Sequence, residues 1–132
     1  MAITIALIES HAGLRRELRE MIATDPDFSC VCAGANWKLE LSDISRLAPD
    51  VIVIDVSLPG GEGLEGVARL KRLLPQAQIL VLSSCEKNEH VLKALRAGAS
   101  GYLLKRIAGR ELLSAVRNLS LTPASHLPWP SP

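Results

Sequence analysis

Aromatic residues are scarce in this chain: Phe, Tyr and Trp together make up 3% of its 132 residues. Apolar residues as a whole account for 48%, so the core must be built mainly from Leu, Ile, Val and Ala. Such an apolar content excludes a disordered chain, and the length fits a single soluble globular domain.

The chain also lacks a large excess of positive or negative charge, since it has 15 basic and 14 acidic residues. Direct nucleic-acid binding by this chain therefore has little support, because it usually requires a basic surface. Long apolar runs are lacking too. The first run is short, has no basic start and soon reaches Glu9, which excludes a signal peptide or a membrane span there. We expect a cytoplasmic protein with no membrane contact.

Cysteine is rare, with Cys30, Cys32 and Cys85 as the three examples. Their number is odd, and no Cys-x-x-Cys or Cys/His spacing of a metal site is present. Because Cys30 and Cys32 are two residues apart in a short apolar run, we expect them on one face of a strand as buried free thiols. A reducing compartment suits this prediction.

Five short apolar runs alternate with segments of helical spacing. The predicted strands lie at 3–8, 28–32, 51–55, 78–82 and 101–105. Several of them are apolar at nearly every position, which is typical of strands covered on both faces. Between them, apolar residues recur every three or four positions, as in Leu64, Val67 and Leu70, and a helix from about 88 to 97 is expected to stop at Gly98. This alternation predicts an α/β fold with a parallel sheet.

The end of the chain differs in composition, since four of its eight prolines fall within the last ten residues. Proline-rich segments of this kind adopt extended conformations and do not join a core. We therefore predict a domain over 1–119 and a proline-rich tail or linker over 120–132.

Polar residues follow four of the predicted strands. They are Glu9 and Ser10 after the first, Asp55 at the end of the third, Ser83 and Ser84 after the fourth, and Lys105 at the end of the fifth. Each alone is commonly a turn, capping or solvated residue. Because the carboxyl ends of parallel strands share one edge, the set together favours a site for a divalent cation such as Mg²⁺ and an oxyanion such as phosphate.

A competing pattern, Gly61-x-Gly63-x-x-Gly66, follows Asp55. A dinucleotide-binding fingerprint belongs on the first strand–helix turn, and that turn has no glycine cluster here. Gly63 is expected to allow a close approach or a positive φ, whereas Gly66 falls inside a helix, where glycine is only tolerated. The glycines therefore do not favour a nucleotide cofactor.

Four pieces of the chain carry a family resemblance: "LIESH", "VIVIDVSLPGGEG", "VLSS" and "AGASGYLLK", in that order. Over roughly 3–119, the chain resembles the CheY-like receiver domain of bacterial two-component response regulators, most closely the LuxR/NarL-type branch. The resemblance implies the flavodoxin-like (βα)5 fold, a doubly wound parallel sheet with strand order 2-1-3-4-5. It also implies a signalling module and not an enzyme.

The resemblance assigns the chemistry to Asp55, which would accept a phosphoryl group from the phosphohistidine of a histidine kinase. Mg²⁺ would bind Glu9, Asp55 and the backbone carbonyl of Ser57. The family usually has a second acid at position 10, so Ser10 implies a metal contact that is weak or absent, and thus a weakened Mg²⁺ site. The signalling interpretation also requires an aspartyl oxygen that solvent can reach.

Switching is likewise an implication of the resemblance. Ser83 and Lys105 would bind phosphoryl oxygens, and Tyr102 matches an aromatic switch position. Movement of Tyr102 would repack the face formed by the fourth helix, fifth strand and fifth helix. That face is also where the family leads us to expect a homodimer.

Two functions remain open from the sequence. The first is a phosphorylatable receiver that controls transcription through a C-terminal DNA-binding output domain not found in this chain. The second is a degenerate receiver that acts as a phosphorylation-independent interaction module. The presence of Asp55, Ser83, Lys105 and Tyr102 favours the first.

Overall fold

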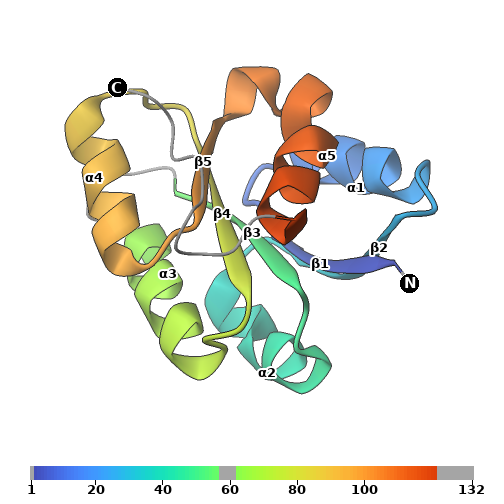
Figure 1. Cartoon of the computed structure of the whole chain (residues 1–132), viewed down its shortest axis with the longest axis horizontal. Coiled ribbons are helices and arrows are strands. Elements are labelled where there is room, and N and C mark those ends of the chain that lie inside the picture. Colours follow the sequence, from blue (N-terminus) through green and yellow to red (C-terminus); the bar gives the residue numbers. More distant parts are fainter. Residues whose placement is uncertain (1, 57–61, 122–132) are drawn as a thin grey trace.

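The computed structural model describes residues 2–56 and 62–121, over which strands and helices alternate (Figure 1). The elements are β1 (Ile3–Ile8), α1 (Ala12–Ala23), β2 (Phe28–Gly34), α2 (Trp37–Leu47), β3 (Val51–Asp55), α3 (Glu62–Leu73), β4 (Gln78–Ser83), α4 (Asn88–Ala97), β5 (Gly101–Leu104) and α5 (Lys105–Leu121). All five predicted strands are present. The fifth ends one residue early, because Lys105 already begins α5.

The five strands form one parallel sheet in the order β2-β1-β3-β4-β5. This confirms the predicted α/β fold and its strand order. The polar residues at or just after the carboxyl ends of β1, β3, β4 and β5 consequently lie along one edge of the sheet.

Two layers of helices cover the sheet, with α1 and α5 on one face and α2, α3 and α4 on the other (Figure 1). Successive residues of β3 alternate between the two cores: Val51 and Val53 pack toward α1 and α5, whereas Ile52 and Ile54 pack toward the opposite layer. All four are fully buried. Burial of such a side chain contributes about 1.5–3 kcal/mol, so this aliphatic run anchors the position of Asp55 at its end.

Local signals at the helix ends explain where three helices start or stop. His11 caps α1, since its Nδ1 accepts a hydrogen bond from the backbone N–H of Leu14 at 3.1 Å. Asn36 caps α2 in the same way, through the N–H of Lys38 at 2.8 Å. Gly98 ends α4 with a φ of 117°, as predicted for a C-terminal glycine.

The glycines after Asp55 serve packing at the two positions that the structure describes; Gly61 lies outside the described residues. A Cβ on Gly63 would lie 2.8 Å from the carbonyl oxygen of Asp55, which confirms the predicted close approach. A Cβ on Gly66 would lie 2.6 Å from the indole ring of Trp37. Glycine is normally only tolerated inside a helix, but at position 66 the close contact with Trp37 leaves no room for a larger residue.

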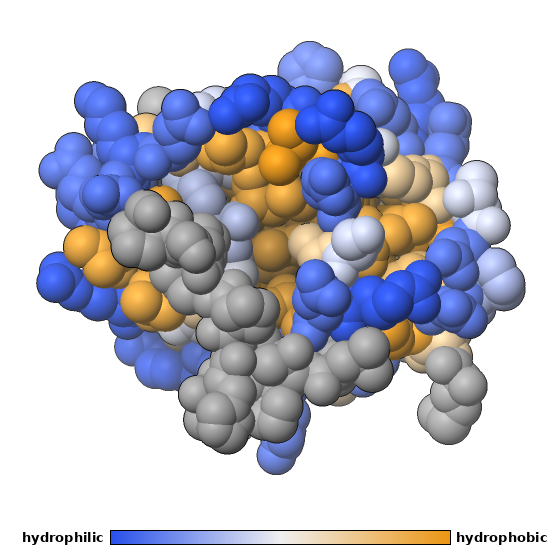
Figure 2. All heavy atoms as spheres, turned by 45° about the horizontal axis from the view of Figure 1, so that its top comes forward, coloured by the Kyte–Doolittle hydropathy of each residue, from blue (hydrophilic) through white to orange (hydrophobic). Residues whose placement is uncertain are grey.

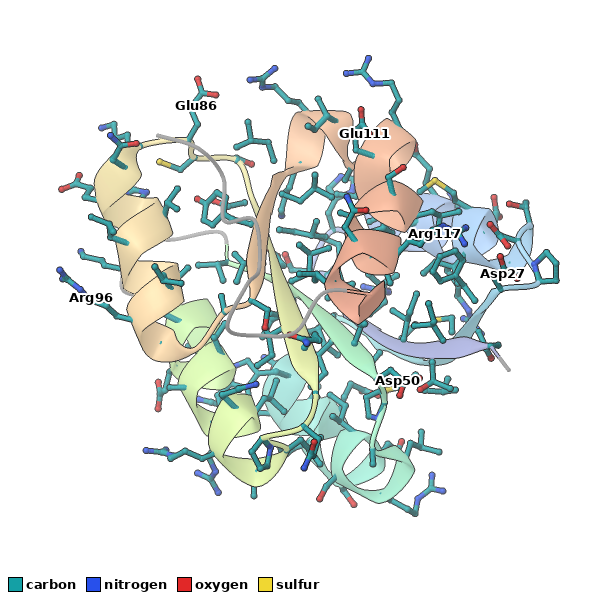
Figure 3. The ribbon with its side chains drawn as sticks, viewed as in Figure 1. Asp27, Asp50, Glu86, Arg96, Glu111 and Arg117 are labelled. Carbon is teal, nitrogen blue, oxygen red and sulfur yellow. The ribbon has the colours of Figure 1, made fainter. Side chains whose placement is uncertain are left out.

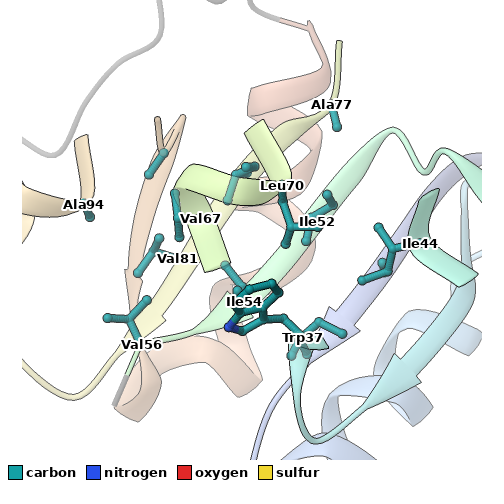
Figure 4. Packing of buried hydrophobic residues seen from close by; sticks show 14 of the residues in the cluster. Trp37, Ile44, Ile52, Ile54, Val56, Val67, Leu70, Ala77, Val81 and Ala94 are labelled. Atoms are coloured by element: carbon teal, nitrogen blue, oxygen red, sulfur yellow. The ribbon is translucent and has the colours of Figure 1, made fainter. Parts of the chain in front are cut away.

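Trp37 occupies the space that Gly66 leaves, and Figure 4 shows its ring beside Ile54 in the core. The side chain is 7% exposed, and its Nε1 donates a hydrogen bond of 2.9 Å to the carbonyl oxygen of Glu62. A tryptophan at the start of α2 thus fixes the first turn of α3.

The prediction that Cys30 and Cys32 share one face of a strand was wrong. The register of β1 against β2 shifts between Ile5 and Ala6, which pair with Cys30 and Cys32 and leave Val31 as an extra residue. This bulge turns the strand, so Cys30 packs against the core under α1 and α5, whereas Cys32 packs in the core under α2, α3 and α4. Both thiols are free, as expected, but only Cys32 is buried, Cys30 is partly exposed, and the two lie on opposite faces of the sheet.

Charged residues join the start of β2 to α5. Arg117 pairs with Asp25 and Asp27, at 3.1 Å each, and its guanidinium lies 4.9 Å from the ring centre of Phe28. Figure 3 shows Arg117 and Asp27 on the same side of the molecule. This contact holds the C-terminal half of α5 against the edge of the sheet.

On the face shown in Figure 2, hydrophilic side chains surround a central area of apolar ones. Within the described part of the chain, the large apolar side chains that remain exposed are Leu39, Leu47, Leu73, Leu92 and Leu95. Two of them, Leu92 and Leu95, lie on α4. Among the described residues, none of the helices has the length and hydropathy needed to span a membrane.

Candidate functional site

Three of the predicted site residues meet at the carboxyl edge of the sheet. The Nζ of Lys105 lies 2.7 Å from Oδ1 of Asp55 and 3.1 Å from Oε2 of Glu9. Because β4 lies between β3 and β5, the side chains of Lys105 and Asp55 together bridge the end of β4 to make this contact. We call Glu9, Asp55 and Lys105 the charge cluster.

Glu9 turns fully into the protein and is 0% exposed. Its Oε2 accepts hydrogen bonds from Lys105 and from the backbone N–H of His11, the latter at 2.9 Å. No donor among the described residues reaches its other oxygen, Oε1. A buried carboxylate oxygen without a donor is energetically unfavourable, so this atom marks a place where a cation would be stabilised.

Ser10 contacts the same oxygen of Asp55 twice. Its hydroxyl donates to Oδ2 at 2.6 Å, and its backbone N–H donates to the same atom at 3.3 Å. Ser10 is itself exposed. Sequence reasoning treated Ser10 only as the loss of an acid, and missed that a hydroxyl, unlike a carboxylate, can donate to its neighbour.

The side chain of Asp55 is 6% exposed. This differs from the expectation that an aspartyl oxygen lies open to solvent. Oδ2 is hydrogen-bonded to Ser10, an exposed residue outside the apolar cores. At this oxygen, the acid therefore contacts a surface side chain.

Ser83 and Tyr102 belong to a second group of residues, next to the charge cluster. Ser83 is 3% exposed, and its Oγ accepts a hydrogen bond from the backbone N–H of Cys85 at 3.0 Å. The hydroxyl of Tyr102 donates to the carbonyl oxygen of Cys85. A small pocket, with room for about one water molecule, is lined by Val56, Leu64, Ser83, Cys85, His90, Lys93 and Tyr102.

Two pKa values report the environment of these groups. Burial alone would lower the pKa of Lys105, but hydrogen bonds and charges from Asp55 and Glu9 outweigh it and raise the pKa above its usual 10.5. Lys105 is therefore protonated at neutral pH. Burial raises the pKa of Tyr102, although its hydrogen bond with Ser83 acts in the opposite direction.

The donors of the charge cluster are of the kind that could hold a cation. Two carboxylates facing one ammonium leave one negative charge, and Oε1 of Glu9 is an unsatisfied acceptor. No group of three His, Cys, Asp or Glu side chains lies close enough to hold a metal within 2–56 and 62–121. Glu9 and Asp55 would hold Mg²⁺, which would neutralise charge on phosphate oxygens. Ser57, whose carbonyl was predicted as a further ligand, lies outside the described residues.

A surface ion pair borders the site and was not foreseen from the sequence. Arg106, the residue after Lys105, lies 3.0 Å from Glu86, which is labelled in Figure 3 just before α4. Both side chains are about 70% exposed, so the pair contributes little to stability. Nothing in the local sequence pattern connects residues 20 positions apart, which is why it was missed.

A doubly wound parallel sheet with two acids and a lysine joined at its carboxyl edge defines a class, the receiver-type α/β domains. Within that class, the sequence model of the response regulator receiver domain matches residues 5–117. The chain belongs to this family, and its relatives are of the LuxR/NarL type, as the sequence had predicted.

Curated relatives include the DNA-binding transcriptional activator DevR/DosR of Mycobacterium tuberculosis. It is 34% identical over 117 residues, which cover 89% of this chain and 54% of the relative. The nitrate/nitrite response regulator protein NarL of Escherichia coli is 35% identical over 113 residues, covering 86% of this chain and 52% of the relative. The chain thus spans about half the length of these relatives.

Solved structures agree on the fold. A LuxR-family two-component response regulator from an Aurantimonas species superposes with a TM-score of 0.82 at 28% identity, covering 92% of this chain and 86% of the other. The response regulator domain of Thermotoga maritima CheB gives a TM-score of 0.81 at 22% identity, with 93% and 99% covered. The second likeness supports the fold alone.

Proposed function

We propose that this receiver domain accepts a phosphoryl group on Asp55 from the phosphohistidine of a histidine kinase. The observation that carries the proposal is the contact of Lys105 with both Asp55 and Glu9, made by residues at the carboxyl ends of three different strands. In the reaction, a carboxylate oxygen of Asp55 forms a bond to phosphorus as the bond from phosphorus to the histidine nitrogen breaks. The histidine leaves with that electron pair.

Each remaining member of the site has a role in this proposal. The ammonium of Lys105 would leave its carboxylate partners in part to bind a phosphoryl oxygen, and the hydroxyl of Ser83 would donate to another. Mg²⁺ held by Glu9, Asp55 and the carbonyl of Ser57 would supply charge neutralisation. The missing acid at position 10 weakens that cation site, and the inward turn of Glu9 partly compensates.

Switching would follow from the second group of residues. Tyr102 is half-buried, with its hydroxyl on the carbonyl of Cys85, and Ser83 lies in the same small pocket. A shift of Ser83 toward a phosphoryl group would change the space available to Tyr102. Phosphorylation would thus favour one packing of the α4-β5-α5 face, where a homodimer would form, and Leu92 and Leu95 supply exposed apolar surface.

Output through DNA is a further part of the proposal. DevR/DosR is named as a DNA-binding transcriptional activator, and this chain matches about half of its length. We take residues 1–119 as the receiver and 120–132 as a linker toward an output domain that controls transcription. Helix α5 continues to Leu121, two residues beyond the proposed boundary.

A titration with Mg²⁺ and beryllofluoride, which mimics a phosphoryl group, tests the central claim. In ¹⁵N NMR spectra we expect saturable shifts of amides around Asp55, with none in Asp55→Asn. Ser10→Asp restores a carboxylate and should tighten Mg²⁺ binding by about tenfold, since one nearby charge contributes a few kcal/mol before desolvation and screening are subtracted. An unchanged Mg²⁺ dissociation constant would contradict this account of the cation site.

The second candidate function is a degenerate receiver that works as a phosphorylation-independent interaction module. It is favoured by the 6% exposure of Asp55 and by Ser10 in place of an acid. Under this alternative the wild-type spectrum stays unchanged at high Mg²⁺ and beryllofluoride concentrations. Asp55→Asn would then have no effect on partner binding.

A further inference from the structure

Ser10 gives two donors to a single oxygen of the acid at the centre of the site. Oδ2 of Asp55 accepts from the Ser10 hydroxyl at 2.6 Å and from its backbone N–H at 3.3 Å, while Oδ1 faces Lys105 at 2.7 Å. A carboxylate oxygen has two lone pairs. Oδ2 therefore accepts two hydrogen bonds from Ser10.

We infer that Ser10 is a positioning residue that holds Asp55 in a hydrogen-bonded resting state and slows its phosphorylation. The inference rests on the proposed role of Asp55 as the acceptor. To form a bond to phosphorus, the attacking oxygen must direct a lone pair at that atom. Because Oδ1 is paired with the Lys105 ammonium, we take Oδ2 as the attacking oxygen. The Ser10 hydroxyl donates to Oδ2, occupies a lone pair there and withdraws electron density, so this hydrogen bond must break before Oδ2 can attack.

The chemistry of serine suits this role, whereas that of an acid does not. A carboxylate at position 10 would repel Asp55 and could only accept, but the Ser10 hydroxyl both donates and accepts. Ser10 is exposed, so its side chain can turn to water, or present a lone pair to a cation, without disturbing the core. Breaking the hydrogen bond between the Ser10 hydroxyl and Asp55 therefore requires the rotation of one side chain and leaves the fold intact.

The size of the effect follows from the class of hydrogen bond. Bonds to an ionised acceptor are stronger than those between neutral groups, and this one is short at 2.6 Å. Loss of the hydroxyl should speed phosphorylation of Asp55 about tenfold at saturating Mg²⁺, which corresponds to roughly 1.4 kcal/mol. The backbone N–H of residue 10 remains in every variant, so the hydroxyl alone is tested.

The test measures phosphorylation of the 132-residue chain by acetyl phosphate with Mg²⁺, followed by intact mass. Ser10→Ala should react about tenfold faster than wild type, and Ser10→Thr, which keeps the hydroxyl, should react at nearly the wild-type rate. Ser45→Ala, which removes an exposed serine hydroxyl from α2, is the matched control and should change nothing. The free energy of unfolding by urea is measured for each variant to show that stability does not explain the rates.

A second readout needs no phosphorylation. Without ligand, Asp55→Asn should shift the Ser10 amide resonance, because a neutral acceptor weakens the hydrogen bond. Ser10→Ala should also bind beryllofluoride more tightly than wild type.

The possible outcomes distinguish a failure of the restraint by Ser10 from a failure of the proposed phosphorylation of Asp55. If Ser10→Ala reacts at the wild-type rate or more slowly while wild type is phosphorylated, the restraint is disproved and the hydroxyl is idle or assists the reaction. If wild type and every Ser10 variant remain as unreactive as Asp55→Asn, the proposed function itself fails, and this inference with it.

Discussion

Replacement of Lys105 by Met tests how strongly the charge cluster depends on its one cation. The change keeps an unbranched side chain but removes the ammonium that lies 2.7 Å from Asp55 and 3.1 Å from Glu9. Those carboxylates are 6% and 0% exposed, so water cannot replace the lost charge. Removing one partner from a buried ion pair typically costs about 3–5 kcal/mol of unfolding free energy.

A loss of that size is large beside the roughly 5–15 kcal/mol by which domains are stable. For a chain of this length it corresponds to a fall in melting temperature of roughly 10–20 °C. The free energy is measured by urea unfolding at pH 7, with circular dichroism as the signal. Arg106→Met is the matched control, because it removes a neighbouring cation whose partner Glu86 is exposed, and it should cost less than about 1 kcal/mol.

The same variant gives a pH test with a defined sign. The pKa of Lys105 is raised above 10.5 in the folded protein, so its stabilising contribution is complete below pH 10.5 and declines as the pH rises through the folded value. The difference between wild type and Lys105→Met should therefore narrow above pH 10.5. A Lys105→Met protein that is no less stable than Arg106→Met at pH 7 would refute the reasoning about buried charge.

One further variant and one chemical modification test the packing of the core that contains Trp37 and Cys32. Gly66→Ala should destabilise the protein by about 1–3 kcal/mol in urea although Ala favours helix, because its Cβ would lie 2.6 Å from Trp37. The loss should shrink in a Trp37→Leu background, and a more stable Gly66→Ala protein would contradict the packing described. Burial, with the nearby charge of Glu40, raises the pKa of the Cys32 thiol to about 11, so iodoacetamide at pH 8 should alkylate Cys32 far more slowly in the folded than in the urea-unfolded chain. Equal rates would show that the thiol is not buried.

The strands were predictable because their signal is local. Runs such as Val51 to Ile54 are apolar at every position, and that pattern alone indicates a strand covered on both faces. Position at the end of a parallel strand then indicates that Glu9, Asp55 and Lys105 share an edge. Both steps need only the sequence and the geometry of a sheet.

What the sequence could not provide depends on side-chain direction and on irregular backbone. The bulge at Val31 reverses the face of Cys32, and no residue type in that run signals it. The hydrogen bonds from Ser10 to Asp55 depend on how a loop residue turns, which the identity of the residue leaves open. Likewise, the need for Gly66 is visible only once Trp37, 29 positions earlier, is known to lie against it.

Lys105 is both the cation of the charge cluster and the first residue of α5. The strand before it ends at Leu104, so no connecting loop stands between sheet and helix to absorb a displacement. A new partner that displaces this ammonium would therefore act on a residue at the start of a helix of 17 residues. A change in the contacts of this ammonium at the sheet edge would therefore act directly on the first turn of α5.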